Sequence, residues 1–131
     1  MTPPTMYARV GGDKFFDALT RRFYDAVDSD PVLRPLYPED HEGLEAARRH
    51  LRDFLIQFWG GPSTYSDERG HPRLRMRHAP FTIGQAERDR WVQLMTAAVR
   101  AGGLGPLDEQ QMLSYFSGAA TQLINQQEAA G

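Results

Sequence analysis

The sequence predicts an all-α domain. Apolar residues recur at the i, i+3, i+4, i+7 spacing of amphipathic helices in several segments. Glycine and proline fall between these segments, and no segment shows the sustained alternation of a β-strand. With 131 residues, 40% hydrophobic and 24% charged, the chain has the size and composition of one globular domain.

Two helices are expected near the N-terminus. Thr5 can cap a short helix over residues 6–10, which Gly11 ends. Asp13 is the candidate N-cap of the second helix, which runs until Asp30 because a residue before proline avoids the helical region. The apolar stripe of the second helix consists of Phe16, Leu19, Phe23 and Val27.

A corner punctuated by prolines follows over residues 32–38, and a third helix over residues 44–58 ends at Gly60. The corner residues expected to point inward are Leu33, Leu36 and Tyr37. The stripe of the third helix consists of Leu44, Ala47, Leu51, Phe54, Leu55 and Phe58.

The second half of the chain predicts three further segments. Residues 63–71 lack periodicity and are expected to form an exposed loop, while Pro72 suits the first turn of a short helix over residues 73–78. Residues 82–85 have the form of a capping box that starts a helix, and a glycine-rich turn at 102–106 precedes the last helix. The stripes of these two helices are Trp91, Leu94, Met95 and Ala98, then Met112, Leu113, Phe116, Ala119, Ala120, Leu123 and Ile124.

The composition excludes several kinds of chemistry. Without cysteine there is no disulfide, thiolate nucleophile, iron–sulfur cluster or cysteine-ligated haem. Lys14 is the only lysine, which nearly excludes Schiff-base catalysis, and no phosphate loop, dinucleotide fingerprint or nucleophile elbow occurs. A borderline metal would depend on one or more of four side chains, His41, His50, His71 and His78.

Neither a targeting segment nor a membrane-spanning one is expected. The polar tail of about residues 1–5 lacks a basic patch and an apolar core, and the longest apolar runs are only a few residues. A second polar tail covers about residues 125–131. The formal charge of −2 creates no field that attracts nucleic acid or a membrane. We therefore expect a single cytoplasmic domain over residues 1–131.

Residues 69–78 combine four arginines with two histidines. A solvated basic loop is the simplest interpretation, and a nucleic-acid patch is disfavoured because no aromatic side chains are interleaved. His78 is more informative than His71, since it ends a short helix with Leu74 one turn earlier. It can be a core imidazole bonded to a backbone carbonyl, or the ligand of a metal.

A single imidazole facing an apolar slot is what a five-coordinate haem iron requires. The Leu74 carbonyl could accept the other ring N–H of His78, and nearby arginines could pair with the haem propionates. Large apolar side chains that could converge with His78 are Phe54, Leu55, Phe58, Trp59, Phe81, Trp91, Met95 and Phe116.

Tyr24 and Trp91 carry polar groups on or beside apolar stripes and need partners when buried. A backbone carbonyl would satisfy each of them. If haem were present, both could instead donate to bound oxygen, and Tyr37 could do the same. His50 is expected to point aside, and His41 to be exposed at the start of its helix.

The chain resembles the group II truncated haemoglobins, of the kind common in actinobacteria, from about residue 7 to residue 125. The most specific matching segments are Phe58-Trp59-Gly60-Gly61-Pro62, Tyr65-Ser66 and residues 69–81. Further matches are Arg22-Phe23-Tyr24, Leu36-Tyr37-Pro38-Glu39-Asp40 and Glu87-Arg88-Asp89-Arg90-Trp91.

This resemblance implies a two-over-two helical sandwich around haem b, with His78 as the proximal iron ligand. The other expected haem-pocket residues are Leu51, Phe54, Leu55, Met76, Arg77, Phe81, Trp91, Met95 and Phe116. The distal positions that face the ligand are Tyr24, Tyr37, Trp91 and Ala47. The small Ala47 leaves the ligand-stabilising role to Tyr24 and Trp91.

We therefore expect a haem protein that reversibly binds oxygen and other diatomic ligands, for transport or sensing. The alternative is a redox enzyme using the same haem, a nitric oxide dioxygenase or a peroxidase. Turnover would need an electron donor such as a reductase, because the chain encodes no flavin or nicotinamide module. A third interpretation is a cofactor-free helical module that binds a partner through residues 69–77. A monomer and a homodimer are both compatible with the sequence.

Overall fold

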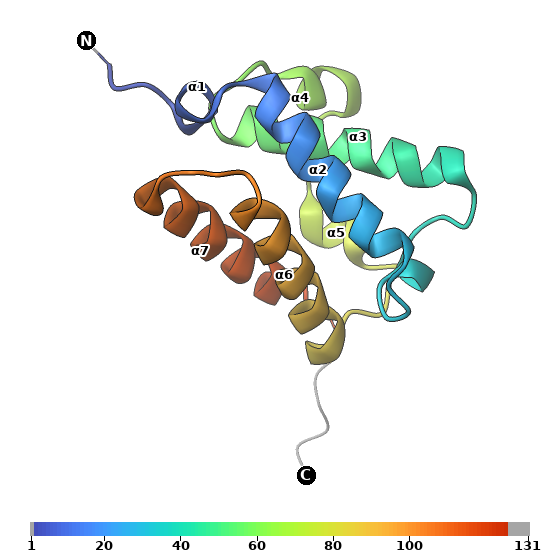
Figure 1. Cartoon of the computed structure of the whole chain (residues 1–131). Coiled ribbons are helices and arrows are strands. Elements are labelled where there is room, and N and C mark those ends of the chain that lie inside the picture. The colour runs from blue at the N-terminus through green and yellow to red at the C-terminus, as the bar shows by residue number, and fades with distance from the viewer. Residues whose placement is uncertain (1, 126–131) are drawn as a thin grey trace.

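The computed structural model describes residues 2–125, and within that range every regular element is helical (Figure 1). The prediction of an all-α domain is therefore confirmed. In chain order the elements are α1 (Met6–Val10), α2 (Asp13–Asp28), the 3-10 turn η1 (Arg34–Leu36), α3 (His41–Phe58), α4 (Thr64–Arg69), α5 (Leu74–His78), α6 (Gln85–Arg100) and α7 (Pro106–Gln122).

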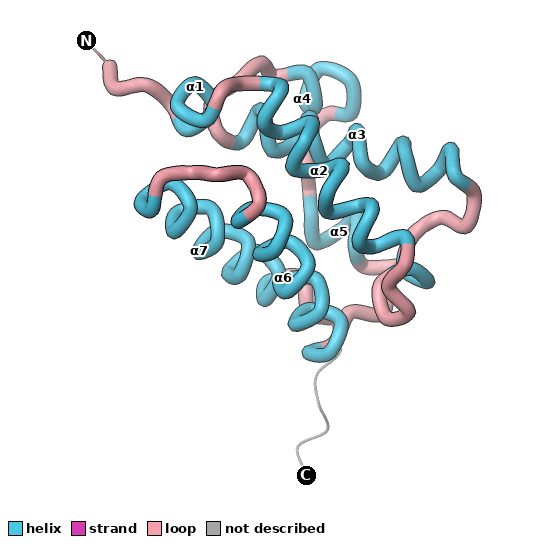
Figure 2. The backbone as a smooth tube through the Cα atoms, in the orientation of Figure 1, coloured by secondary structure: helices cyan, strands magenta, loops and turns pink. Residues whose placement is uncertain are grey.

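Four long helices form two pairs. α2 packs on α3 and α6 packs on α7, while α2 also packs on α6 and so joins the two pairs (Figure 1). The short α4 packs beside α3. Irregular segments link these helices, as the pink parts of the tube in Figure 2 show. The arrangement is two helices over two.

The core lies where the stripes of the long helices meet. The predicted stripe of α2 is confirmed, because its four apolar residues are fully buried. Leu55 and Met95 meet it from α3 and α6, and Met112 meets it from α7. Burying a side chain of this size contributes about 1.5–3 kcal/mol. The helices are thus held by side chains that were already periodic in the sequence.

The first two helix starts show one confirmed cap and one correction. The Thr5 side chain accepts a hydrogen bond from the amide of Ala8 at 3.2 Å, and Gly11 ends α1 with a left-handed φ of 108°. Asp13, in contrast, is the first residue of α2 and not its N-cap, which is Gly12. The Asp13 carboxylate instead accepts a hydrogen bond from the hydroxyl of Tyr7 at 2.6 Å.

The expectation of an exposed loop over residues 63–71 was wrong, because most of it forms α4. Tyr65 in this helix is only 5% exposed. The Gln57 side chain at the end of α3 donates to the Ser66 hydroxyl at 2.7 Å and accepts from the Ser66 amide at 2.9 Å. A six-residue helix has too little length to show periodicity, so its stability comes from this contact with α3.

Two further helix starts differ from the sequence prediction. α5 begins at Leu74, and Arg73 before it has a left-handed φ of 45°. α6 begins at Gln85 with Gly84 as N-cap, and the capping box does not form. Asn125 pairs with Ile83 instead: its side chain accepts from the Ile83 amide at 2.9 Å, and its amide donates to the Ile83 carbonyl at 2.8 Å.

The C-terminal tail predicted after residue 124 lies outside the described residues, apart from Asn125. Across residues 2–125, no helix is both long and apolar enough to cross a membrane.

Candidate functional site

His78 is the last residue of α5 and is half-buried. Its Nδ1 lies 2.7 Å from the carbonyl oxygen of Leu74, as the i−4 spacing predicts. A carbonyl can only accept, so Nδ1 carries the proton and the lone pair on Nε2 remains for another partner. Between residues 2 and 125 no group of three or more His, Asp or Glu side chains could hold a metal ion.

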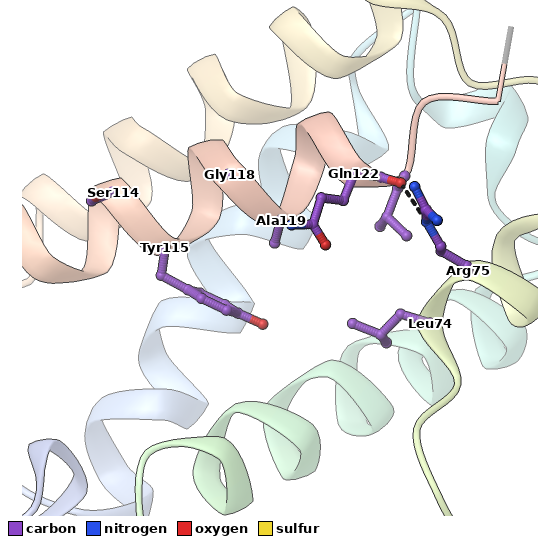
Figure 3. Close-up of a pocket in the computed structure, with 8 residues that line it drawn as sticks. Leu74, Arg75, Ser114, Tyr115, Gly118, Ala119 and Gln122 are labelled. Atoms are coloured by element: carbon purple, nitrogen blue, oxygen red, sulfur yellow. Dashed lines mark hydrogen bonds between the residues drawn. The ribbon is translucent and has the colours of Figure 1, made fainter.

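A hollow of about 330 Å³ opens between α5 and α7, next to the turn that precedes His78 (Figure 3). In the close-up, the Leu74 side chain and the Tyr115 ring project into the same space. The hollow is lined by Leu74, Arg75, Ser114, Tyr115, Gly118, Ala119, Gln122 and Leu123. His78 itself is not in this lining. Ala119 and Leu123 were predicted to lie on the stripe of the last helix, but neither they nor Tyr115 were predicted as pocket residues.

Four separate segments contribute the predicted distal residues. The rings of Tyr24 in α2 and Tyr37 in the corner lie 5.5 Å apart and nearly perpendicular. The Tyr24 hydroxyl donates to the backbone carbonyl of Ala47 in α3 at 3.3 Å. Trp91 in α6 packs edge-on against the ring of Phe23 at 5.2 Å. We refer to Tyr24, Tyr37, Ala47 and Trp91 as the distal cluster.

Both tyrosines of the distal cluster are held neutral. Burial raises the pKa of Tyr37 to about 12, although the neighbouring side chains of Trp91 and Tyr24 act in the opposite direction. Burial also raises the pKa of Tyr24 well above its ordinary value, and the neighbouring Tyr37 adds to this effect while Arg48 opposes it. Each phenol therefore keeps its proton at neutral pH and can donate a hydrogen bond.

Asp30 holds the corner that carries Tyr37. Its buried carboxylate accepts hydrogen bonds from the amides of Val32 and Leu33, both at 2.9 Å, and pairs with Arg90 of α6. Burial raises the pKa of Asp30, but the Leu33 amide, Arg90 and the Val32 amide outweigh it, so the pKa is lowered. From the sequence, Asp30 was expected only to end a helix. The Asp-Pro dipeptide could have suggested this turn.

The remaining predicted pocket residues fall into three groups. Leu55 and Met95 are fully buried in the core, and Phe116 is buried beside them. The second group, partly buried against the same core, consists of Leu51 and Phe54. The third is largely exposed and consists of Met76 at 59% and Phe81 at 42%, although the Phe81 ring lies 6.5 Å from that of His78.

Arg77 lies against Tyr65, a residue that the sequence analysis did not assign to the site. Its guanidinium is 6.0 Å from the Tyr65 ring and donates to the carbonyls of Pro72 at 2.9 Å and Arg69 at 3.0 Å. Arg69 also lies over Tyr65, at 5.8 Å, and its guanidinium is 3.1 Å from Nε2 of His50. Burial lowers the pKa of His50, and Arg69 adds to this effect, so His50 favours its neutral form.

The arginines of residues 69–77 lack acidic partners. In the part of the chain that the structure describes, no carboxylate lies within 4.0 Å of their charged nitrogens, whereas eight other arginines form ion pairs. The four arginines are Arg69, Arg73, Arg75 and Arg77. Their charge is therefore available to an anionic group beside α5.

Comparisons with known proteins agree with this architecture. The sequence model of the bacterial-like globin family matches residues 5–125 of this chain. Group 2 truncated hemoglobin YjbI of Bacillus subtilis (strain 168) is 36% identical over 118 residues, which cover 90% of this chain and 87% of that protein.

Two solved structures extend this similarity to the whole fold. The thermostable hemoglobin of the actinobacterium Thermobifida fusca superposes with a TM-score of 0.91 at 53% identity, covering 95% of this chain and 100% of the other. The group II truncated hemoglobin of Bacillus anthracis gives 0.92 at 30% identity, with coverage of 100% and 98%. The chain belongs to the bacterial-like globin family, as a group II truncated haemoglobin.

Proposed function

We propose that this protein binds haem b through Nε2 of His78 and thereby binds oxygen and other diatomic ligands reversibly. Membership of the globin family implies a haem cofactor. The observation that carries the residue assignment is the 2.7 Å contact between His78 Nδ1 and the Leu74 carbonyl, because it leaves Nε2 as a neutral nitrogen ligand. Haem would supply the iron to which the diatomic ligand binds.

The residues around α5 fit such a group. The hollow beside α5 offers apolar contacts from Leu74, Ala119 and Leu123. Phe58 stacks on Tyr115, which lines the hollow, with ring centroids 4.3 Å apart. Phe58 is nevertheless 48% exposed, so it offers apolar surface that a bound group could bury. The arginines without carboxylate partners suit the two propionates of haem b.

On the distal side, the arrangement favours Tyr37 as the donor to a ligand. The indole N–H of Trp91 can only donate, and Trp91 lowers the pKa of Tyr37, as a donor facing the Tyr37 oxygen would; this leaves the phenol proton for a ligand. The Tyr24 hydroxyl is directed to the Ala47 carbonyl at 3.3 Å, a long bond to a group inside α3. Tyr24 is therefore the weaker of the two donors, because its proton is already shared with the Ala47 carbonyl. The resemblance to the family had implied instead that Tyr24 and Trp91 have the stabilising role.

Hemin titration of the purified protein tests the proposal. We expect a Soret band that saturates at one hemin per chain, and His78→Ala should lose tight retention of hemin. His71→Ala is the matched control, because His71 is exposed and its Nδ1 is engaged only with the Arg73 amide at 3.2 Å. No Soret band, or equal damage in both variants, would contradict the assignment.

Reversible oxygen binding requires ferrous haem, so an external reductase belongs to the same proposal. We place the protein in the cytoplasm, as a monomer or a homodimer, with a role in oxygen transport or sensing. The stopped-flow oxygen dissociation rate of the reduced protein then reports how strongly the distal cluster stabilises the ligand.

A further inference from the structure

A series of aromatic rings connects the distal cluster with Tyr7, which lies in α1, just before the start of α2. The ring centroids are 5.7 Å apart between Trp91 and Phe116, and 5.5 Å apart between Phe116 and Trp59. They are 5.9 Å apart between Trp59 and Phe16, and 6.2 Å apart between Phe16 and Tyr7. The two tryptophans and the tyrosine can be oxidised by one electron, whereas the phenylalanines only bridge them.

Trp59 and Tyr7 are also joined through the backbone. The Tyr7 amide donates a hydrogen bond to the Trp59 carbonyl at 2.9 Å. Gly61 leaves room for the tyrosine ring, because a Cβ at this position would lie 2.8 Å from Tyr7 Cδ2. Trp59 is buried, whereas Tyr7 is half-buried and reaches the surface. Electron transfer between these two side chains thus has a short path through a hydrogen bond and a ring.

Tyr7 has a proton acceptor in place. Its hydroxyl donates to Oδ1 of Asp13 at 2.6 Å, the short distance typical of a hydroxyl and a carboxylate. A phenol that loses an electron becomes a strong acid, so a carboxylate at this distance can take its proton in the same step. Tyr24, by comparison, donates to a backbone carbonyl, which cannot take a proton at neutral pH.

We propose that Trp91, Trp59 and Tyr7 form a relay that carries an oxidising equivalent from the haem pocket to the surface, with Asp13 accepting the phenol proton. The relay rests on the haem binding proposed above. Its oxidant is hydrogen peroxide, whose O–O bond breaks as it takes two electrons from the haem protein and, with two protons, leaves as two water molecules.

One of these electrons is restored from Tyr7. The electron passes from Tyr7 through Trp59 and Trp91, the O–H bond breaks, and its proton moves to Asp13. A neutral tyrosyl radical remains at the surface, and the other oxidising equivalent stays on the haem. Tyr7 is then where a one-electron donor too large for the pocket, such as a soluble phenol, reacts: it gives Tyr7 an electron and a proton.

The test uses the ferric holoprotein, mixed with hydrogen peroxide and freeze-quenched for electron paramagnetic resonance. In parallel, a nitroso spin trap followed by peptide mass spectrometry locates the radical. We expect a tyrosyl signal with the adduct on Tyr7, and loss of that adduct in Tyr7→Phe. Trp59→Phe should slow the formation of the Tyr7 radical, because it removes the intermediate site.

Asp13→Asn is the sharpest variant. Asparagine still offers an oxygen to the Tyr7 hydroxyl, so Tyr7 keeps its place, but the base is lost. We expect the Tyr7 radical to form about 100-fold more slowly, the low end of what a positioned base contributes. Tyr65→Phe is the control, since it removes a buried tyrosine outside the relay and should leave the Tyr7 adduct unchanged.

The outcomes separate the relay from the proposed function. If hemin gives no Soret band, the relay loses its source of oxidising equivalents and falls together with haem binding. If the Soret band forms but the adduct lies on Tyr24, Tyr37 or Tyr115 and not on Tyr7, the relay alone is wrong. An unchanged rate in both Asp13→Asn and Trp59→Phe overturns it as well.

Discussion

The guanidinium of Arg90 forms an ion pair with the buried carboxylate of Asp30, 60 residues earlier in the chain. Arg90 immediately precedes Trp91 in α6, and Asp30 begins the corner that carries Tyr37. The pair therefore fixes the two elements that carry Tyr37 and Trp91 of the distal cluster. Under the proposed function, ligand stabilisation and fold stability therefore depend on the same contact.

Replacing Arg90 with methionine should destabilise the protein, because the Asp30 carboxylate is then buried without its counter-charge. We expect a lower Tm by circular dichroism and faster oxygen release from the holoprotein. Arg21→Met is the control: the Arg21–Asp17 pair is exposed, so its loss should change the free energy of unfolding by only about 0.5 kcal/mol. Equal Tm values for the two variants would contradict this prediction.

Oxygen release should depend most on Tyr37 and Trp91. Tyr37→Phe removes the proposed donor, and Trp91→Phe removes the N–H beside it, so we expect each to speed dissociation about tenfold, equivalent to ~1.4 kcal/mol. Tyr24→Phe should have a smaller effect, because the Tyr24 hydroxyl is engaged with Ala47. Stopped-flow release of oxygen measures all three, with carbon monoxide, a poorer hydrogen-bond acceptor, as the control ligand. The largest effect in Tyr24→Phe would reverse the assigned order.

Asp17 should make stability depend on acid pH. Hydrogen bonding from Arg21, against the opposing effect of burial and with help from Arg48 and Arg52, lowers the pKa of Asp17 to about 2. A carboxylate with a lowered folded-state pKa stabilises the fold above its unfolded pKa of about 4, and this contribution is lost as the pH falls from about 4 to 2. Because Asp17 is about one-third exposed, we expect only about 1 kcal/mol.

Urea unfolding between pH 2 and pH 7 measures this contribution. Asp17→Asn should be less stable at neutral pH and should show a shallower loss of stability on acidification. Asp25→Asn, an exposed aspartate of the same helix with no ion pair in the described structure, should keep the slope of the unmodified protein. Parallel pH profiles for the two variants would show that Asp17 carries no such linkage.

Gly118 offers a test of the hollow between α5 and α7. A Cβ built on it meets nothing within 4 Å, so Gly118→Ala should fit and raise the free energy of unfolding by about 0.5–1 kcal/mol through helix propensity. Gly118→Phe would place a ring in the hollow and should weaken hemin uptake while leaving the helix content unchanged. Undiminished hemin affinity in Gly118→Phe would show that haem does not use this space.

Most of the helices could be predicted from local sequence. The α2 stripe that begins at Phe16, and the Thr5 cap of α1, follow from residues within a few turns of each other. The contact of His78 with Leu74 was predictable for the same reason, since a helix always brings residue i close to the carbonyl of residue i−4. The resemblance over residues 58–81 added the family, which the comparisons confirm.

What only the tertiary structure decided involves partners distant in sequence. α4 forms because Gln57 pairs with Ser66, and the start of α6 is set by Asn125, 42 residues from Ile83. Among the distal residues, sequence spacing supplied the candidates but could not rank them. The proposed order of the donors depends on which acceptor each hydroxyl or indole N–H faces. The fold determines this, because the Asp30–Arg90 pair holds the corner with Tyr37 against α6.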